Sequence, residues 1–199
     1  RRILARWVEE APQYNVEDLK VPFSATGEKT AEISRFTLLG KKDPDGSGSS
    51  GTVRSDGRGL VFTFDVRKAG VPPVSREGLT EEAFPEGDKI ELFLSSPTLG
   101  YCHFAFDCEG RRYEAKGLDG KWSCPWDVKT TRTKDGWSAE VRIPYAPLGL
   151  APQVDPRVKF LAMVSLSPGD LKERNRNVCW RGGMPHTPSS WGTLFIGLE

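Results

Sequence analysis

The most constraining feature of the sequence is the strict alternation of apolar and polar residues just after Gly136. The apolar positions are Trp137, Ala139, Val141 and Ile143. A period of two is that of a β-strand with one face buried and the other in solvent. Lys134-Asp135-Gly136 predicts a tight turn before this strand, and residues 126–133 predict its hairpin partner.

Short apolar or alternating runs, separated by turn residues, recur along the chain. They predict further strands at 31–39, 60–66, 89–94, 101–107, 111–115, 158–166 and 193–196. A helical turn is predicted at 144–148, and the segment 41–51 (KKDPDGSGSSG) indicates a flexible surface loop. The chain is therefore predicted to be all-β: a two-layer antiparallel β-sandwich of jelly-roll or immunoglobulin-like type, with about nine to eleven strands.

The same alternation predicts which large side chains fill the core. They are Phe62, Phe64, Ile90, Leu92, Trp126, Trp137, Val141 and Phe160.

Composition excludes several classes of function. The net charge is +1, and acidic and basic residues are mixed along the chain, so no basic stripe indicates nucleic acid binding. The longest apolar runs are too short to span a membrane. The 199 residues fit one domain over 1–199, and the start at Arg1 favours a fragment of a larger protein, which we expect to be a monomer.

The four cysteines are Cys102, Cys108, Cys124 and Cys179. None forms a C-x-x-C pair, so neither a zinc knuckle nor a redox motif is indicated. Two disulfides and buried free thiols both stay open, although Cys102 and Cys108 lie too far apart on one strand to bond to each other.

Catalytic motifs are missing from the sequence. It has no G-x-S-x-G or H-E-x-x-H segment, and only two histidines. Glu91 and Glu140 are the best pair for a glycosidase, provided that they converge. We expect the chain not to be an enzyme.

Segments spread over most of the chain carry a family resemblance. They are DGRGLVFTF (56–64), GDKIELFL (87–94), YCHFAFDCEG (101–110), GWSAEVRIP (136–144) and HTPSSWGTL (186–194). In this order they resemble the family 9 carbohydrate-binding modules and their wider relatives, the DOMON-like β-sandwiches. The resemblance implies a secreted module, extracellular or periplasmic, that binds oligo- or polysaccharide beside an appended catalytic domain in a polysaccharide-degrading protein. It also admits structural calcium.

The resemblance implies positions for a sugar site. Members that bind sugar hold it between two aromatic rings and bond its hydroxyls with charged and amide groups. The family carboxylate falls on Glu91, which we expect at a concave face or, alternatively, in a salt bridge. One aromatic corresponds to Phe84, in place of Trp. The second is expected where Met184-Pro185-His186 stands, and His186 is interpreted as a brace for the final loop.

Other side chains suit a sugar on chemical grounds, because sugars need flat aromatic faces and planar polar groups. Trp122, in a Gly-rich turn, and Trp180, near the expected sugar loop, are candidate platforms, with packing as the alternative. His103 and Arg181 are candidate partners for hydroxyl or carboxylate groups, with a structural histidine and a solvated loop as the alternatives.

Two other functions stay open. Ala105 and Met163 replace an Arg and a Gln of the family's sugar site, which favours a structural spacer without ligand. Met163, with His103 or Met184, is a candidate pair of haem ligands for electron transfer.

A calcium site is a weaker candidate. Asp43 and Asp45 have alternating oxygen ligands but lack the full calcium-loop spacing.

Overall fold

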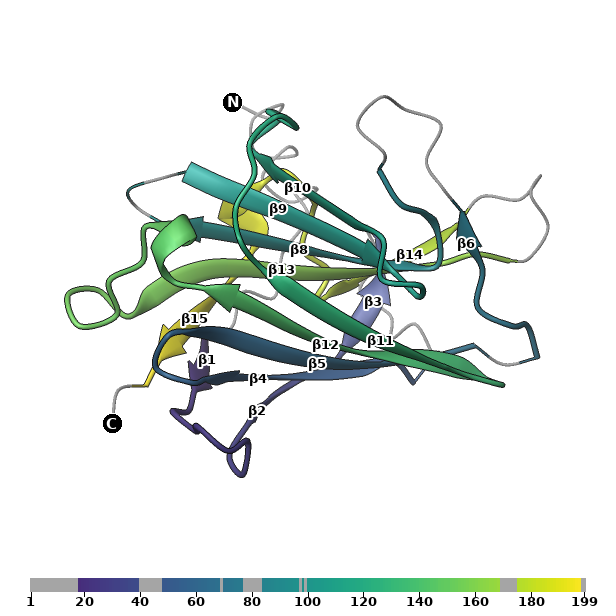
Figure 1. The fold of residues 1–199 in the computed structure, drawn as a ribbon, viewed down its shortest axis with the longest axis horizontal. Coiled ribbons are helices and arrows are strands. Elements are labelled where there is room, and N and C mark those ends of the chain that lie inside the picture. Colours follow the sequence, from purple (N-terminus) through teal and green to yellow (C-terminus); the bar gives the residue numbers. More distant parts are fainter. Residues whose placement is uncertain are drawn as a thin grey trace, which may run out of the picture.

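The computed structural model describes residues 18–39, 48–68, 70–76, 84–96, 98, 100–168 and 175–197. Figure 1 shows a structure built almost entirely of strands. In this part of the chain the helices are two 3-10 turns, η1 (Ala146–Leu148) and η2 (Pro188–Ser190), and neither helix has the length or apolarity to cross a membrane. The predicted turn at 144–148 corresponds to η1.

The strands form two large sheets and one small one. In the described residues the first sheet has eight strands. Six of them follow in the order β1 (Asp18–Val21), β15 (Gly192–Ile196), β13 (Arg157–Leu166), β8 (Lys89–Ser96), β9 (Gly100–Asp107) and β10 (Arg112–Lys116). The other two are β14 (Arg176–Trp180), which pairs with β13, and β3 (Phe36–Leu38), which pairs with β14. The second has the order β11 (Asp127–Thr133), β12 (Gly136–Pro144), β5 (Gly59–Arg67), β4 (Ser50–Ser55) and β2 (Ala31–Ile33). β6 (Ser75–Arg76) pairs β7 (Glu86–Gly87) separately.

The core lies between the two large sheets. Phe62 of β5 stacks on Phe160 of β13, with ring centroids 5.3 Å apart. Phe106 of β9 meets Trp137 of β12 edge to face at 6.1 Å. All of the residues predicted for the core are buried. The prediction of an all-β, two-sheet sandwich is therefore confirmed.

The segment predicted as one strand at 31–39 is two strands in different sheets. β2 pairs with β4 in the second sheet, whereas β3 pairs with β14 in the first. Between them Arg35 has a φ of 62°, a left-handed conformation that turns the chain. Alternation alone does not reveal such a corner, because both halves bury apolar side chains in the same core.

Other elements also differ from the prediction. The structure has fifteen strands in its described residues, more than the nine to eleven predicted, and β1 runs parallel to β15 rather than antiparallel. β4 begins at Ser50, inside the predicted loop, because Gly51 leaves space for the Phe64 ring: a Cβ there would come within 2.6 Å of it. Residues 41–47 of that loop lie outside the described residues.

Trp137 tests the core assignment. We expect Trp137→Ala to lower the free energy of unfolding by about 3–5 kcal/mol, because it removes a buried ring and leaves a cavity. Trp137→Phe should cost much less, since it keeps most of the packing and removes an indole N–H that has no hydrogen-bond partner within the described part of the chain. Urea denaturation measures both, and a loss below about 1 kcal/mol for the alanine variant would contradict the assignment.

Candidate functional site

The outer face of the eight-stranded sheet carries the candidate site. In β8, Ile90, Leu92 and Leu94 point into the core, so Glu91 and Phe93 point outward. This confirms the predicted orientation of Glu91. The pairing of β8 with β9 places His103 opposite Phe93 on the same outer face.

Glu91 and His103 form the polar centre of this face. The Nε2 atom of His103 lies 2.9 Å from Oε2 of Glu91, and Lys89 Nζ lies 3.8 Å from Oε1. Glu91 is 6% exposed and His103 5%. The imidazole stacks on Phe93, with ring centroids 4.2 Å apart and an interplanar angle of 9°. The salt-bridge alternative for Glu91 and the structural role for His103 are thus both present in the structure.

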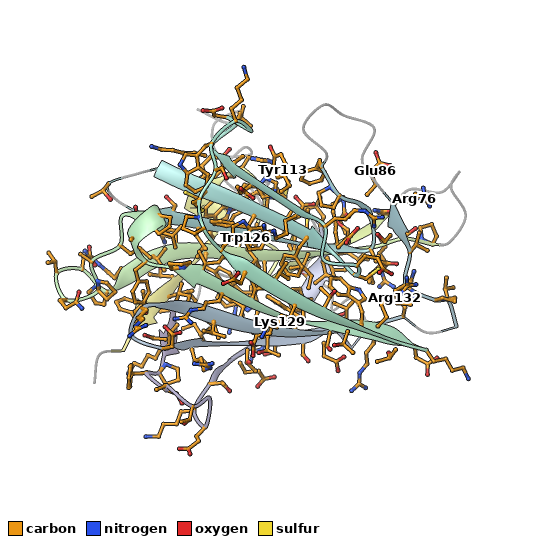
Figure 2. The ribbon with its side chains drawn as sticks, in the orientation of Figure 1. Arg76, Glu86, Tyr113, Trp126, Lys129 and Arg132 are labelled. Carbon is orange, nitrogen blue, oxygen red and sulfur yellow. The ribbon has the colours of Figure 1, made fainter. Side chains whose placement is uncertain are left out.

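Two half-buried aromatic rings flank this pair on the β10 side. Phe84 meets Tyr113 of β10 edge to face at 4.9 Å and lies 5.8 Å from His103. Lys89 Nζ lies 4.9 Å from the centre of the Phe84 ring. Figure 2 marks Tyr113 on this edge of the sheet. The structure therefore brings Phe84, Glu91 and His103 together, as the sequence analysis expected.

The connection between β14 and β15 covers the other side of the pair. Trp191 is fully buried and packs against Phe93 and Tyr101 on the outer face. His186 meets Phe93 edge to face at 5.2 Å, and its Nδ1 lies 2.9 Å from the Tyr101 hydroxyl oxygen. His186 thus braces this loop, as interpreted, but it also lies directly beside the candidate site.

Trp180 and Trp122 do not lie in this cluster. Trp180 is 1% exposed and packs on Phe160 in the core at 5.3 Å, so the prediction that it is an open sugar platform is wrong. Its place in β14 turns the ring inward. Half-buried Trp122 meets the inward-facing Phe104 at 6.2 Å, which places it on the opposite side of the sheet from Glu91. Trp122 therefore packs against the edge of the core, the alternative to its role as a sugar platform.

Arg181 follows β14 directly and is partly buried. Its guanidinium carbon lies 5.2 Å from the centre of the Trp180 ring, and burial lowers the pKa of the guanidinium. Its backbone has a φ of 53°, and its N–H donates to the carbonyl oxygen of Arg35 at 3.1 Å. A role for Arg181 in ligand binding stays a prediction.

Two buried carboxylates fix the ends of the strands that carry the site. Asp88, just before β8, accepts hydrogen bonds from Lys68 Nζ at 2.8 Å and from the backbone of Val74 and Ser167. Asp107, at the end of β9, accepts from Arg111 and from backbone N–H groups of its own turn. These contacts hold the loop before β6 against the ends of β8 and β9.

Small polar side chains extend the same outer face across β13, β14 and β3. Ser165 lies opposite both Lys89 and Asn177, and Thr37 lies opposite Cys179. Among the described residues, three buried oxygen atoms here find no hydrogen-bond partner: Thr37 Oγ1, Ser165 Oγ and Asn177 Oδ1. An unpaired buried polar group costs about 1–3 kcal/mol.

Sequence reasoning missed several residues of this face. Tyr113, Tyr101, Lys89 and Phe93 all contact the Glu91–His103 pair or its immediate neighbours. Alternation along each strand was the signal that could have found them. Glu91 pairs with Ala105 of β9, and Ala105 pairs with Tyr113 of β10, so the odd-numbered residues of all three strands face outward.

The other chemical alternatives find little support in the described residues. Glu140 is exposed on the outer face of the second sheet, so the whole sandwich separates it from Glu91 and the two do not form a glycosidase pair. Haem ligation through Nε2 of His103 would have to break the contact of that atom with Glu91.

A metal centre is not assigned either. In the part of the chain that the structure describes, no group of three or more His, Cys, Asp or Glu side chains is arranged to hold a metal ion. Asp43 and Asp45 lie outside the described residues.

The chain is similar to known proteins in its fold and not in its sequence. No protein-family model and no curated protein matches the chain. Its structure is similar to a family 9 carbohydrate-binding module from Caldicellulosiruptor kristjanssonii solved with cellotriose (TM-score 0.64, 15% identity, 92% of this chain and 95% of that one). A family 9 module from the same organism, solved with glucose, has a TM-score of 0.63 and 14% identity, and the match covers 92% of this chain and 97% of that one. A putative carbohydrate-binding protein from Bacteroides uniformis has a TM-score of 0.65 and 16% identity, and the match covers 91% of this chain and 99% of that one.

These similarities define the class of structure: the chain has the β-sandwich fold of the family 9 carbohydrate-binding modules. With 14–16% of residues identical, the similarities establish the fold alone. It is the fold that the sequence resemblance implied.

The buried Asp88–Lys68 pair gives a stability prediction. We expect Asp88→Asn to lower the free energy of unfolding by about 3–5 kcal/mol, because it leaves the Lys68 ammonium buried without a counter-charge. Asp65→Asn, which breaks the exposed pair of Asp65 with Arg67, is the matched control and should cost less than about 1 kcal/mol. Equal losses in urea denaturation for the two variants would contradict this assignment.

The thiols give a second prediction, because all four cysteines are free. Burial raises the pKa of Cys102 and Cys108 to about 11, and that of Cys124 and Cys179 to about 12. The thiolate is the reactive form, so at pH 8 the folded protein should react slowly with Ellman's reagent, and four thiols should titrate in guanidinium. Fewer than four in denaturant without reductant would show that a disulfide forms.

Proposed function

We propose that this chain is a non-catalytic carbohydrate-binding module whose site is the outer face around Glu91. The observation that carries the proposal is the Glu91–His103 pair flanked by the rings of Phe84 and Tyr113. A sugar needs apolar planes for its C–H faces beside hydrogen-bonding groups for its hydroxyls, and this cluster offers both. The likeness to modules solved with cellotriose and glucose supports the same ligand class.

The Glu91 carboxylate and the Lys89 ammonium have different proposed roles in binding a sugar. Glu91 Oε2 is held by His103, so Oε1, near Lys89 Nζ, is the oxygen proposed to accept a sugar hydroxyl. Lys89 can donate to a second hydroxyl while it stays close to Phe84.

The arrangement supports binding without turnover. Glycoside hydrolysis uses two carboxyl groups on either side of the scissile bond, and Glu91 lacks Glu140 as such a partner. Cys179 is the thiol near Glu91, and burial raises its pKa to about 12, so it stays protonated and unreactive at neutral pH.

The wider context is proposed on the likeness of fold. Modules of this kind act beside catalytic domains, and we propose an extracellular or periplasmic monomeric module of a polysaccharide-degrading protein. A structural spacer is the second candidate, favoured by the near-complete burial of Glu91 and His103, which already satisfy each other.

The aromatic edge of the site can be tested by substitution. Phe84→Ala and Tyr113→Ala should each weaken saccharide binding at least tenfold, since each removes an aromatic plane and the apolar area that the sugar would bury against it. Their melting temperatures should change little, because both rings are only half-buried. Glu91→Gln should weaken binding less, since the amide keeps one acceptor. A glycan array followed by calorimetry with cellotriose measures these effects.

Trp122→Ala is the matched control, because Trp122 is also half-buried but lies on the other side of the sheet. It should leave affinity unchanged. No binding on the array or in calorimetry at millimolar saccharide would favour the spacer. Release of sugar from a polysaccharide, lost in Glu91→Gln, would show instead that the chain is an enzyme.

A further inference from the structure

The two histidines of the chain, far apart in sequence, converge at the candidate site. His103 lies on β9 and His186 in the loop between β14 and β15, yet their ring centroids are 5.5 Å apart with an interplanar angle of 89°. His103 is buried and bonded to Glu91. His186 is exposed, so it is the histidine that a ligand on this face can reach.

The ring of His186 is held in place at one nitrogen. Nδ1 lies 2.9 Å from the Tyr101 hydroxyl oxygen, and the ring edge packs on Phe93. The contacts of the described residues include no partner for Nε2. With Nδ1 engaged, Nε2 of the neutral ring is the complementary donor or acceptor, according to the tautomer.

The loop backbone also fixes this position. His186 has a φ of 56°, a conformation that non-glycine residues adopt rarely and that clusters at functional sites. Ser190, 3% exposed, bonds the backbone of Met184 and Thr187, and the Trp191 indole N–H donates to the Met184 carbonyl at 2.8 Å. These contacts hold the strained residue beside the site.

We propose that His186 contacts the bound sugar through Nε2, and that its titration makes binding tighter at neutral than at acidic pH. This inference rests on the proposed function and adds to it a contact residue and a mode of regulation. A neutral imidazole exchanges hydrogen bonds with a hydroxyl as donor or acceptor, whereas an imidazolium is only a donor and carries a charge that water must solvate.

The direction of the pH effect follows from the surroundings of His186. Burial lowers its pKa most, His103 lowers it further, and Glu91 raises it. Among the described residues, the other ionisable groups on this face are Lys89 of β8, Tyr101 of β9, Tyr113 of β10 and Cys179 of β14, and Arg181 begins the same loop as His186. A sugar over the ring removes more water and disfavours the charged form further, so below the pKa binding must release a proton.

That proton release sets the size of the effect. Affinity should fall by up to about tenfold for each pH unit between the His186 pKa of the free protein and its lower pKa in the complex, and should be independent of this group above the pKa of the free protein. The tighter-binding range is therefore the one in which His186 is neutral, including pH 7.

The experiment is calorimetry between pH 5 and pH 8 with cellotriose, or with the strongest array saccharide if cellotriose is not bound. Wild type should bind several-fold more tightly at pH 7 than at pH 5, with little change between pH 7 and pH 8. His186→Asn keeps a donor and an acceptor without titrating, so it should bind at pH 7 and lose most of this pH dependence. His186→Ala should bind at least tenfold more weakly at pH 7, with Trp122→Ala as the control that keeps the wild-type profile.

The outcomes separate this inference from the proposed function. A wild-type pH profile in His186→Asn, or wild-type affinity in His186→Ala, would overturn the inference while saccharide binding itself stands. Absence of binding at every pH would overturn the proposed function and this inference with it. In the protein without sugar, an NMR titration of the two imidazoles should give His186 a pKa below that of a free histidine, and saturating sugar should lower that pKa further. A His186 pKa that sugar leaves unchanged would overturn the pH effect.

Discussion

The packing of two sheets through one layer of aromatic side chains is the constraint on which the rest of the structure depends. Phe62 against Phe160 and Phe106 against Trp137 fix the spacing and register of the strands. Because neighbouring residues on a strand point to opposite faces, burying one set of side chains sends the other set outward. The position of Glu91 and its neighbours on the outer face is thus a consequence of how the core packs, and a change of register by one residue would remove the site.

The outer face is unusual because it is buried as well. Phe93, His103 and Trp191 form a second aromatic layer under the loop between β14 and β15, and Glu91 lies within it. A carboxylate in such surroundings requires partners, and His103 and Lys89 supply them. The same contacts that make burial of Glu91 tolerable also present one of its oxygens beside the aromatic edge of Phe84.

The chain keeps the fold of the family 9 modules at about one residue in seven identical. A sandwich tolerates this because core positions require apolar volume and alternation rather than particular residues. A ligand site requires particular groups at particular positions, so the replacements that the sequence resemblance implies at Phe84, Ala105 and Met163 would alter what the face binds without altering how it folds. In the proposed binding module, Tyr113 and His186 are the contacts particular to this chain.

The sequence by itself determined the all-β class, most strand positions and the core, because each depends on local alternation and on turn residues that a short segment carries within itself. It also determined the outward orientation of Glu91, which follows from its neighbours on one strand. Only the tertiary structure decided the corner at Arg35, the inward turn of Trp180, and the meeting of His103 with His186. These depend on pairing between strands distant in sequence and on the path of a loop across a sheet, and the physical reason is that periodicity encodes which face a residue takes but not which strand or loop lies beside it.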